Sequence, residues 1–248
     1  MSDKPNKDIV YAKPLAFEFT YYLSDIVQDS HEYHEFLQLL DTATENDTIR
    51  IIINNYGGEA GTCVQIVNTI RECKGHVIGV LAGEACSAAG IIFMACHSQE
   101  VGQHTMLMIH QAIGGNYGKL SDAPSRIQAE LARTKSLYND VFEFFLTQEE
   151  IDAVLEGKDF WLNDPEIIKR LEARADKLQK QHKDAIDKAQ QDFLASMEVD
   201  ELPEAILKKL TKLQLIAYIQ GDIIVDVKED GETFEIIEIE DEEPPKLH

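Results

Sequence analysis

The sequence predicts an α/β fold in which strands and helices alternate. Two observations predict it. Three short apolar runs read as strands, and the segments between them, GTCVQIVNTIREC and SAAGIIFMAC, have helical periodicity. The three runs are IRIIINN, HVIGVLA and TMLMIH. Strand, helix, strand, helix, strand in this order is typical of an α/β unit with right-handed crossovers, in which ligands gather at the carboxyl ends of the strands.

The first elements follow from the same patterns. Residues 15–24 (LAFEFTYYLS) partly alternate and predict a strand, whereas residues 31–44 (HEYHEFLQLLDTAT) repeat apolar residues at helical spacing. IRIIINN is a continuous β-branched run, which favours a strand buried on both faces of a parallel sheet. This run ends at Tyr56-Gly57-Gly58.

The middle of the chain predicts helices. A long amphipathic helical stretch covers residues 125–145, and a second helix follows a capping box formed by Thr147 and Glu150. Residues 165–196 are helical and very polar, which is typical of a solvated or coiled-coil helix.

The composition changes again near residue 199. A short helix (PEAILKKLTKLQLIAYI) precedes two alternating runs around Asp230-Gly231, a strong hairpin signal. Residues 221–248 carry eleven acidic side chains against two lysines, so we expect the last of them to form a disordered acidic tail. We therefore divide the chain into an N-terminal segment (1–14), a main domain (15–198) and a small acidic C-terminal appendage (199–248).

Charge and composition exclude several classes of function. The formal net charge of −22 argues against binding to nucleic acid or to an anionic membrane surface, both of which need clustered lysine and arginine. The N-terminus has no secretory signal pattern, and no window approaches the length of a membrane span, so we expect a cytoplasmic protein.

The cysteines predict neither disulfides nor a metal site. They lie in apolar or helical surroundings without CxxC pairing, which favours buried thiols over disulfides or zinc. The four are Cys63, Cys73, Cys86 and Cys96. No phosphate-binding loop is recognisable either, because GxGxxG is absent and GGNYGK lacks the spacing of a Walker motif.

Three features at predicted strand ends could supply the parts of a nucleophilic site. Ser87 in GEACSAAG lies where a strand meets a helix, Gly57-Gly58 follows a strand, and His110 ends TMLMIH. Each also has a structural interpretation: a helix N-cap, a turn and a core histidine. A serine nucleophile needs a base and an oxyanion site, and these three features could provide them together. His97 is more simply the neighbour of a helix C-terminus than a base.

The order and spacing of the motifs resemble the Clp-type serine proteases (ClpP family). The chain reads IIINNYGG, GEACSAAG and MLMIHQAIGGNYG in the family's order, and the resemblance covers residues 15–168. It implies a crotonase-like fold, with a core of repeated ββα units and a helical handle at residues 125–145. The appendage would then be an extension of a divergent member.

The resemblance also implies roles for individual residues. Ser87 matches the nucleophile, His110 the general base and Asp159, in KDFWLNDPE, the third member of the triad. Asp164 and Asp152 are rivals that lack the aromatic-Leu sequence after them. Gly58 and Ala88 match the residues whose backbone N–H groups form the oxyanion hole, and the glycines that match the substrate-binding strand are Gly114, Gly115 and Gly118.

The implied function is that of a serine endopeptidase acting inside a homo-oligomeric ring on unfolded or partner-delivered proteins. An AAA+ unfoldase would be the partner that uses ATP, and the chain itself would need no cofactor or metal. Alternatives are a viral-type maturation protease acting on capsid or scaffold proteins, a non-catalytic ring or scaffold subunit, and a crotonase acting on acyl-CoA. The chain departs from the family at Asn55-Tyr56, where Ser-Pro is usual, and beyond Asp159, where KRLEARADKLQKQHKD has no glycine.

Overall fold

The computed structural model describes residues 15–113 and 123–196, together with 206, 209–210, 214, 223–228 and 233–238. The chain divides into two compact units, Met1–His182 and Lys183–His248. No helix among these described residues is long and apolar enough to cross a membrane.

A mixed sheet forms the centre of the first unit. In the described chain it has six strands in the order β1-β2-β3-β5-β6, with β4 also paired to β3. Neighbouring strands are parallel except β6, which runs antiparallel to β5. The strands are β1 (Glu18–Val27), β2 (Thr48–Gly58), β3 (His76–Cys86), β4 (Ser98–Val101), β5 (Met106–Ile109) and β6 (Phe160–Asn163). The predicted α/β fold class is confirmed.

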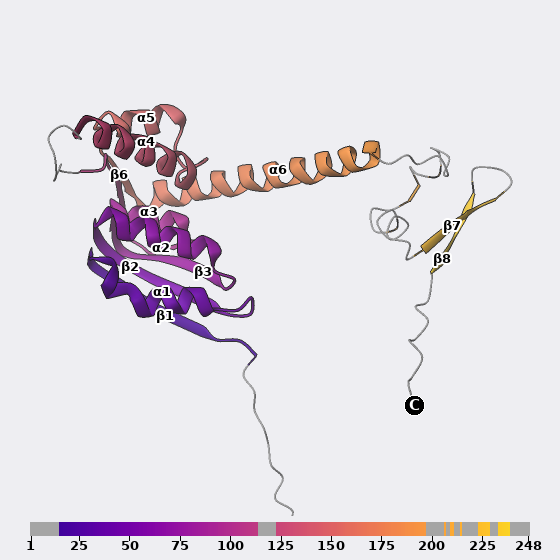
Figure 1. The fold of residues 1–248 in the computed structure, drawn as a ribbon, viewed down its shortest axis with the longest axis horizontal. Coiled ribbons are helices and arrows are strands. Elements are labelled where there is room, and N and C mark those ends of the chain that lie inside the picture. The colour runs from indigo at the N-terminus through magenta and orange to yellow at the C-terminus, as the bar shows by residue number, and fades with distance from the viewer. Residues whose placement is uncertain are drawn as a thin grey trace, which may run out of the picture. The chain divides into compact units, whose positions relative to one another are not determined.

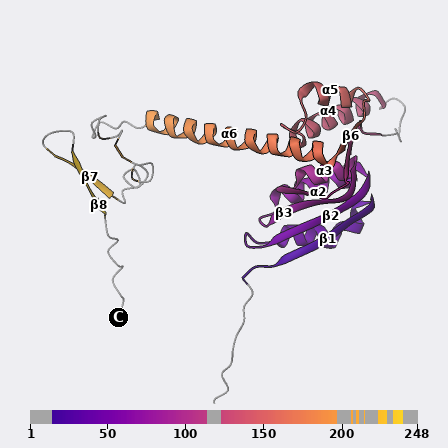
Figure 2. The ribbon, with the colours of Figure 1, turned by 180° about the vertical axis from the view of Figure 1, so that it is seen from behind.

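Helices follow the strands as the periodicity predicted. α1 (His34–Thr42), preceded by the 3-10 turn η1 (Ser30–Tyr33), joins β1 to β2, and α2 (Ala60–Glu72) joins β2 to β3. α3 (Ala88–Ala95) packs against α2 and over β2 and β3. Figures 1 and 2 show these three helices gathered on one face of the sheet.

The expectation that IRIIINN would be buried on both faces is wrong. Ile49, Ile51 and Ile53 are fully buried, whereas Arg50 and Ile52 on the other face are partly exposed. Arg50 makes a two-pronged ion pair with Glu100 of β4, at 2.9 and 2.6 Å. The three helices cover one face of β2, and the opposite face carries this charged pair.

β3 is longer than HVIGVLA because a bulge lets it continue. Its register with β2 moves from Ile53↔Leu81 to Asn55↔Ala85, so four residues of β3 span two of β2. The Oδ1 atom of Asn54 accepts the Glu84 N–H at 3.0 Å across this bulge. β3 pairs with β4 before the bulge and with β5 after it, and it therefore ends directly before Ser87.

The helical handle, expected at residues 125–145, is formed by α4 (Ala123–Val141), and the predicted second helix follows it as α5 (Gln148–Leu155). α4 ends earlier than predicted, and α5 follows a short connection in which Phe144 has φ 61°. The predicted capping box is confirmed: the Thr147 hydroxyl accepts the Glu150 N–H at 3.2 Å, and the Glu150 carboxylate accepts the Thr147 N–H at 2.9 Å.

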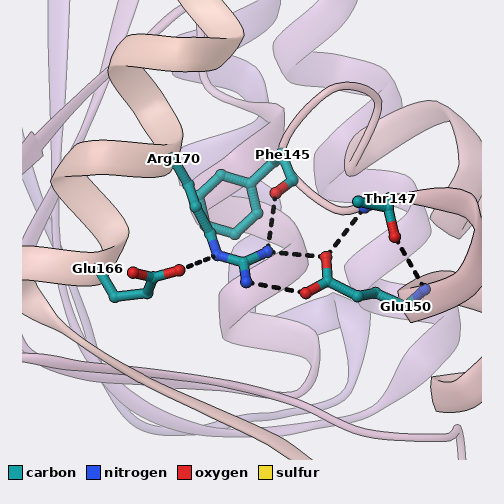
Figure 3. Close-up of polar contacts among 5 residues, drawn as sticks. All are labelled: Phe145, Thr147, Glu150, Glu166 and Arg170. Carbon is teal, nitrogen blue, oxygen red and sulfur yellow. Dashed lines mark hydrogen bonds and ion pairs between the residues drawn. The ribbon is translucent and has the colours of Figure 1, made fainter.

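Arg170 connects α6 (Asp164–Ser196) to α5 and to the segment directly before it (Figure 3). Arg170 donates two hydrogen bonds of 2.8 Å to Glu150, one of 2.7 Å to Glu166 and one of 3.2 Å to the Phe145 carbonyl. One turn further on, Arg174 reaches the Met94 carbonyl near the end of α3. Residues 175–189 of α6 are exposed, as the polar sequence predicted.

The second unit contains the predicted hairpin strands. β7 (Ile223–Val227) pairs antiparallel with β8 (Phe234–Glu238), and Val227↔Phe234 is the pair nearest the turn. The Asp230-Gly231 turn, most of the short helix expected after residue 202 and the acidic tail lie outside the described residues.

Candidate functional site

Four of the predicted site residues line one cavity at the carboxyl edge of the sheet. The cavity has a volume of about 300 Å³, and Gly58, Ser87, Ala88 and His110 are all in its wall. Gly58 ends β2, Ser87 follows β3 and His110 follows β5. Because these strands are parallel, their carboxyl ends meet at one edge, as the sequence predicted.

Ser87 has an unusual backbone conformation, with φ 55° and ψ −122°. Positive φ is uncommon for a residue other than glycine and costs on the order of 1–3 kcal/mol. The Ser87 N–H donates to the Met108 carbonyl at 2.8 Å, and its own carbonyl accepts the Ile91 N–H at 3.1 Å, so both backbone groups hold the turn.

The hydroxyl of Ser87 is not used as a helix cap. Ser87 occupies the N-cap position of α3, yet within the described chain its side chain makes no capping hydrogen bond. The structural interpretation of this serine therefore does not hold, and its Oγ remains available to the cavity.

The glycine pair packs directly against this turn. Gly57 has φ 93°, and a Cβ atom there would lie 2.7 Å from the Cys86 carbonyl oxygen. Gly58 has φ 147°, and a Cβ atom there would collide with the Val27 carbonyl. Both positions therefore require glycine, because the left-handed conformation and the close approach each exclude a side chain.

The Asn55 side chain connects the turn at Gly57-Gly58 to β1 through two hydrogen bonds. It is completely buried; Nδ2 donates to the Ser24 carbonyl and Oδ1 accepts the Gly57 N–H, both at 2.8 Å. In the sequence, Asn55 differs from the family motif and nothing else marks it except its position at the end of a predicted strand. That position was the one signal that could have identified it.

Ala88 opens α3, where the first backbone N–H groups have no partner within the helix and carry a partial positive charge. A Cβ atom on Gly57 would lie 3.2 Å from the Ala88 nitrogen. The backbone of the glycine turn after β2 therefore lies next to the backbone N–H at the start of α3. An oxygen that develops negative charge beside Ser87 would lie near this helix start.

His110 is held by its backbone. Tyr138 of α4 donates its hydroxyl to the His110 carbonyl at 2.7 Å, and burial raises the pKa of Tyr138 to about 12, which keeps this donor protonated. Its neighbour Gln111 donates to the Leu155 carbonyl at 2.7 Å, which ties the end of β5 to the end of α5. Tyr138 carried no signal in the sequence, because its role depends on the packing of α4.

Asp159 lies at the same end of the β5–β6 pair as His110. The last pair of that ladder is Ile109↔Phe160, and His110 and Asp159 are the next residues on the two strands. Asp164 lies at the opposite end, next to the pair Met106↔Asn163, and Asp152 is engaged by Lys135 and Gln148. Of the three carboxylates, Asp159 is the one that the register brings beside His110.

Within the described residues, no hydrogen bond joins Ser87 to His110 or His110 to Asp159, and Asp159 is exposed. Gly114, Gly115 and Gly118 lie outside the described residues. No group of three or more histidine, cysteine or acidic side chains that could hold a metal occurs in the part that is described.

The thiols near the site are poor nucleophiles. All four cysteines are free and buried, as predicted. Burial raises the pKa of Cys63, which lines the cavity, to about 12, and that of Cys86, the neighbour of Ser87, to about 11. Since the thiolate is the reactive form, Ser87 has no competing thiolate beside it at neutral pH.

Comparison with known proteins agrees with this geometry. The family model described as "Clp protease" matches residues 12–169, which include every element of the site described above. Over 137 residues the chain is 28% identical to the "ATP-dependent Clp protease proteolytic subunit" of Porphyromonas gingivalis, covering 53% of this chain and 60% of that protein. Over 148 residues it is 28% identical to the "ATP-dependent Clp protease proteolytic subunit 2" of Pseudomonas aeruginosa, covering 58% of this chain and 69% of that one.

The chain thus spans 60% and 69% of the lengths of these two relatives, at low identity. The family match covers more than half of the chain, and it coincides with the sheet, the handle and the cavity that contains Ser87. The chain belongs to the Clp protease family.

Proposed function

We propose that this protein is a serine endopeptidase that cleaves peptide bonds in unfolded or partner-delivered proteins. The observation that carries the proposal is the position of Ser87. Its hydroxyl is not used as a cap, its backbone is held in a strained turn, and it shares one cavity with His110 and with the backbone of Gly58 and Ala88.

In this mechanism the Ser87 Oγ attacks the carbonyl carbon of the peptide while His110 takes the hydroxyl proton. His110 then gives that proton to the leaving amine, and an acyl-enzyme remains. Water, deprotonated by His110, attacks the acyl-enzyme and releases the second product. Asp159 would hold the imidazole in the useful tautomer from its place beside His110 on β6.

The oxyanion is stabilised by backbone N–H groups at Gly58 and Ala88. The start of α3 and the glycine turn approach each other closely, which supports this assignment. Catalytic hydrogen bonds are often long without substrate and shorten in the complex, so we expect the Ser87, His110 and Asp159 contacts to form when a peptide is bound.

We further propose that the chain assembles into homo-oligomeric rings and receives substrates from an AAA+ unfoldase. The support is family membership, together with the words "ATP-dependent" and "proteolytic subunit" in the names of two relatives. ATP would be used by the partner, because the proposed chemistry needs only side chains, backbone N–H groups and water.

A fluorophosphonate probe tests the proposal, because it reacts covalently with activated serines. We expect labelling of the wild-type protein, none of Ser87→Ala, and labelling that is at least about 100-fold slower in His110→Ala. Ser136→Ala, which changes an exposed serine of α4, is the matched control and should label at the wild-type rate.

Absence of labelling on a folded and assembled wild-type protein would overturn the proposal and indicate a non-catalytic subunit. Labelling that persists in Ser87→Ala would place the nucleophile elsewhere. Cleavage of an unfolded protein such as casein, followed by mass spectrometry of the fragments, then separates an endopeptidase from an esterase.

A further inference from the structure

The cavity beside Ser87 has mostly apolar walls. Cys63 and Val64 come from α2, Ile91 from α3, and Leu137 and Tyr138 from α4. A peptide whose carbonyl lies at Ser87 has one side chain close enough to enter this space. Apolar walls favour a side chain with an aliphatic stem.

Among the described residues, the side chain that brings a permanent positive charge into this wall is an arginine. Arg133 of α4 lines the cavity, and no carboxylate does so among the described residues. This is unexpected for a chain with 45 acidic and 23 basic residues. The charge of Arg133 acts on the Cys63 thiol in the cavity wall, where it opposes the rise in the pKa of Cys63 caused by burial, and on the Glu59 carboxylate at the start of α2.

The present partner of Arg133 is replaceable. Its guanidinium contacts Glu130 at 2.5 Å, and both side chains are about half exposed, 48% and 50%. Exposed pairs at this spacing on a helix contribute little to stability, so exchanging Glu130 for another carboxylate has a low cost. Glu59 is already engaged, because its carboxylate accepts the Thr62 N–H as the cap of α2.

We propose that Arg133 is a specificity-determining residue that selects an acidic side chain, glutamate above all, on the residue whose carbonyl Ser87 attacks. This inference rests on the proposed function. The aliphatic stem of glutamate would lie against the apolar walls while its carboxylate pairs with the guanidinium, a combination that arginine forms with two parallel hydrogen bonds.

Equilibrium binding tests this without any need for catalysis. Fluorescent peptides that differ only at the residue before the scissile bond, glutamate or its uncharged isostere glutamine, are titrated into Ser87→Ala. We expect the glutamate peptide to bind about 10-fold more tightly, with the ratio falling as salt is raised. Adding Arg133→Met should reduce the ratio to about one, and Arg133→Glu should make a lysine peptide the preferred one.

Lys135→Met is the matched control. Lys135 lies on the same helix, pairs with Asp152 at 3.7 Å and is not in the cavity wall, so its loss should leave the glutamate-to-glutamine ratio unchanged. Circular dichroism of each variant confirms folding, and Arg133→Gln replaces Arg133→Met if the latter does not fold.

The outcomes separate the two proposals. Equal binding of the glutamate and glutamine peptides, or a ratio that survives Arg133→Met, overturns the role of Arg133 even when the wild-type serine is labelled by the probe. Discrimination that depends on Arg133 in a protein whose serine is not labelled supports the binding role and contradicts the proposed hydrolysis. In an active wild-type protein the same ratio should appear in kcat/KM.

Discussion

A Cβ atom on Gly57 would lie 2.6 Å from the Cβ atom of Ser87. The turn after β2 and the turn after β3 therefore touch through backbone, with no room for a side chain between them. Carbon atoms in ordinary contact lie 3.5–4.0 Å apart, so this approach exists only because residue 57 is glycine. The position of the candidate nucleophile is thus set in part by an absent side chain.

Replacing Gly57 by alanine should remove activity while leaving the sheet folded. Alanine would be strained at φ 93°, and its methyl group would displace the Ser87 turn and the Ala88 N–H. Loss of an oxyanion donor typically costs about 10²–10³ in rate, so we expect labelling by the fluorophosphonate probe to slow by at least about 100-fold.

Gly61→Ala is the control for this change. Gly61 lies in α2, where the nearest atoms to a new Cβ would be the Glu59 carboxylate oxygens at 3.1 and 3.3 Å, at the end of a side chain that can move. Alanine is favoured over glycine in a helix by about 0.5–1 kcal/mol. Wild-type labelling of Gly57→Ala would show that the contact with Ser87 has no role in placing the nucleophile.

Much of the fold was predictable, because the signals are local. The β-branched run of β2 and the helical spacing of α2 each indicate one element. Gly58 ends a recognisable strand, and Ser87 and His110 directly follow two others. Parallel strands bring their carboxyl ends together, so the gathering of these residues at one edge followed from topology alone.

The missed features depend on tertiary contacts. β4 and β6 are four residues each, too short to show a period. The bulge that carries β3 past Gly83 is stabilised by the Asn54 side chain from the neighbouring strand. Tyr138 and Arg133 reach the cavity from α4, and no spacing along the chain indicates which side of that helix faces Ser87.

Arg170→Met should destabilise the protein by about 1–3 kcal/mol, because it leaves the carboxylates of Glu150 and Glu166 without their partner (Figure 3). The pair with Glu150 is partly buried, with both side chains 22% exposed, which distinguishes it from the exposed pairs elsewhere. Urea unfolding of Arg170→Met, Glu150→Gln and the double variant gives the coupling between the two residues.

The same pair predicts a dependence on pH. The hydrogen bonds from Arg170 lower the pKa of Glu150 in the folded state below its ordinary value of 4.5. Its contribution to stability is therefore complete above about pH 4.5 and is lost as the pH falls through the folded-state pKa. Two results together would contradict a stabilising pair between Arg170 and Glu150. One is purely additive effects on stability in the double variant, and the other is an unchanged loss of stability at acid pH in Arg170→Met. Lys135→Met, which removes an exposed ion pair with Asp152, should leave the dependence of stability on acid pH unchanged.

His97 should make the folded state sensitive to mild acid. It follows α3, as the sequence indicated, but its Nδ1 atom accepts the Val77 N–H at 3.0 Å and its ring lies 5.8 Å from that of His76. Burial and then the charge of His76 lower the pKa of His97 in the folded state below the ordinary histidine value of 6.5. Protons therefore bind the unfolded chain first, and stability falls as the pH drops below about 6.5 toward the folded-state pKa.

Urea unfolding at pH 7.5 and pH 5.5 measures this effect as a difference between variants. His97→Gln keeps an acceptor for Val77 but cannot titrate, so it should lose less stability between the two pH values than the wild type. His182→Gln alters an exposed histidine of α6 and should behave as the wild type does. Parallel losses in the wild type and His97→Gln would assign the acid sensitivity to other groups.

Ending the chain at Glu198 should leave peptide hydrolysis intact, because the contacts that anchor α6 lie near its start. Ile167 is fully buried, and Arg170 and Arg174 make the polar contacts to Glu150 and Met94. Residues 175–189 are exposed, and the boundary between the compact units follows His182. We expect the stability of the first unit to change by no more than about 0.5 kcal/mol, as for surface changes remote from the core.

Ile167→Ala in the full chain is the positive control, since removal of a buried isoleucine side chain costs about 2–5 kcal/mol. Peptide hydrolysis, thermal unfolding and light scattering are measured on all three proteins. Retained hydrolysis with reduced degradation of a natural protein substrate would assign the C-terminal appendage a role in recruitment, whereas a collapse of assembly on truncation would make it a structural part of the oligomer and contradict this expectation.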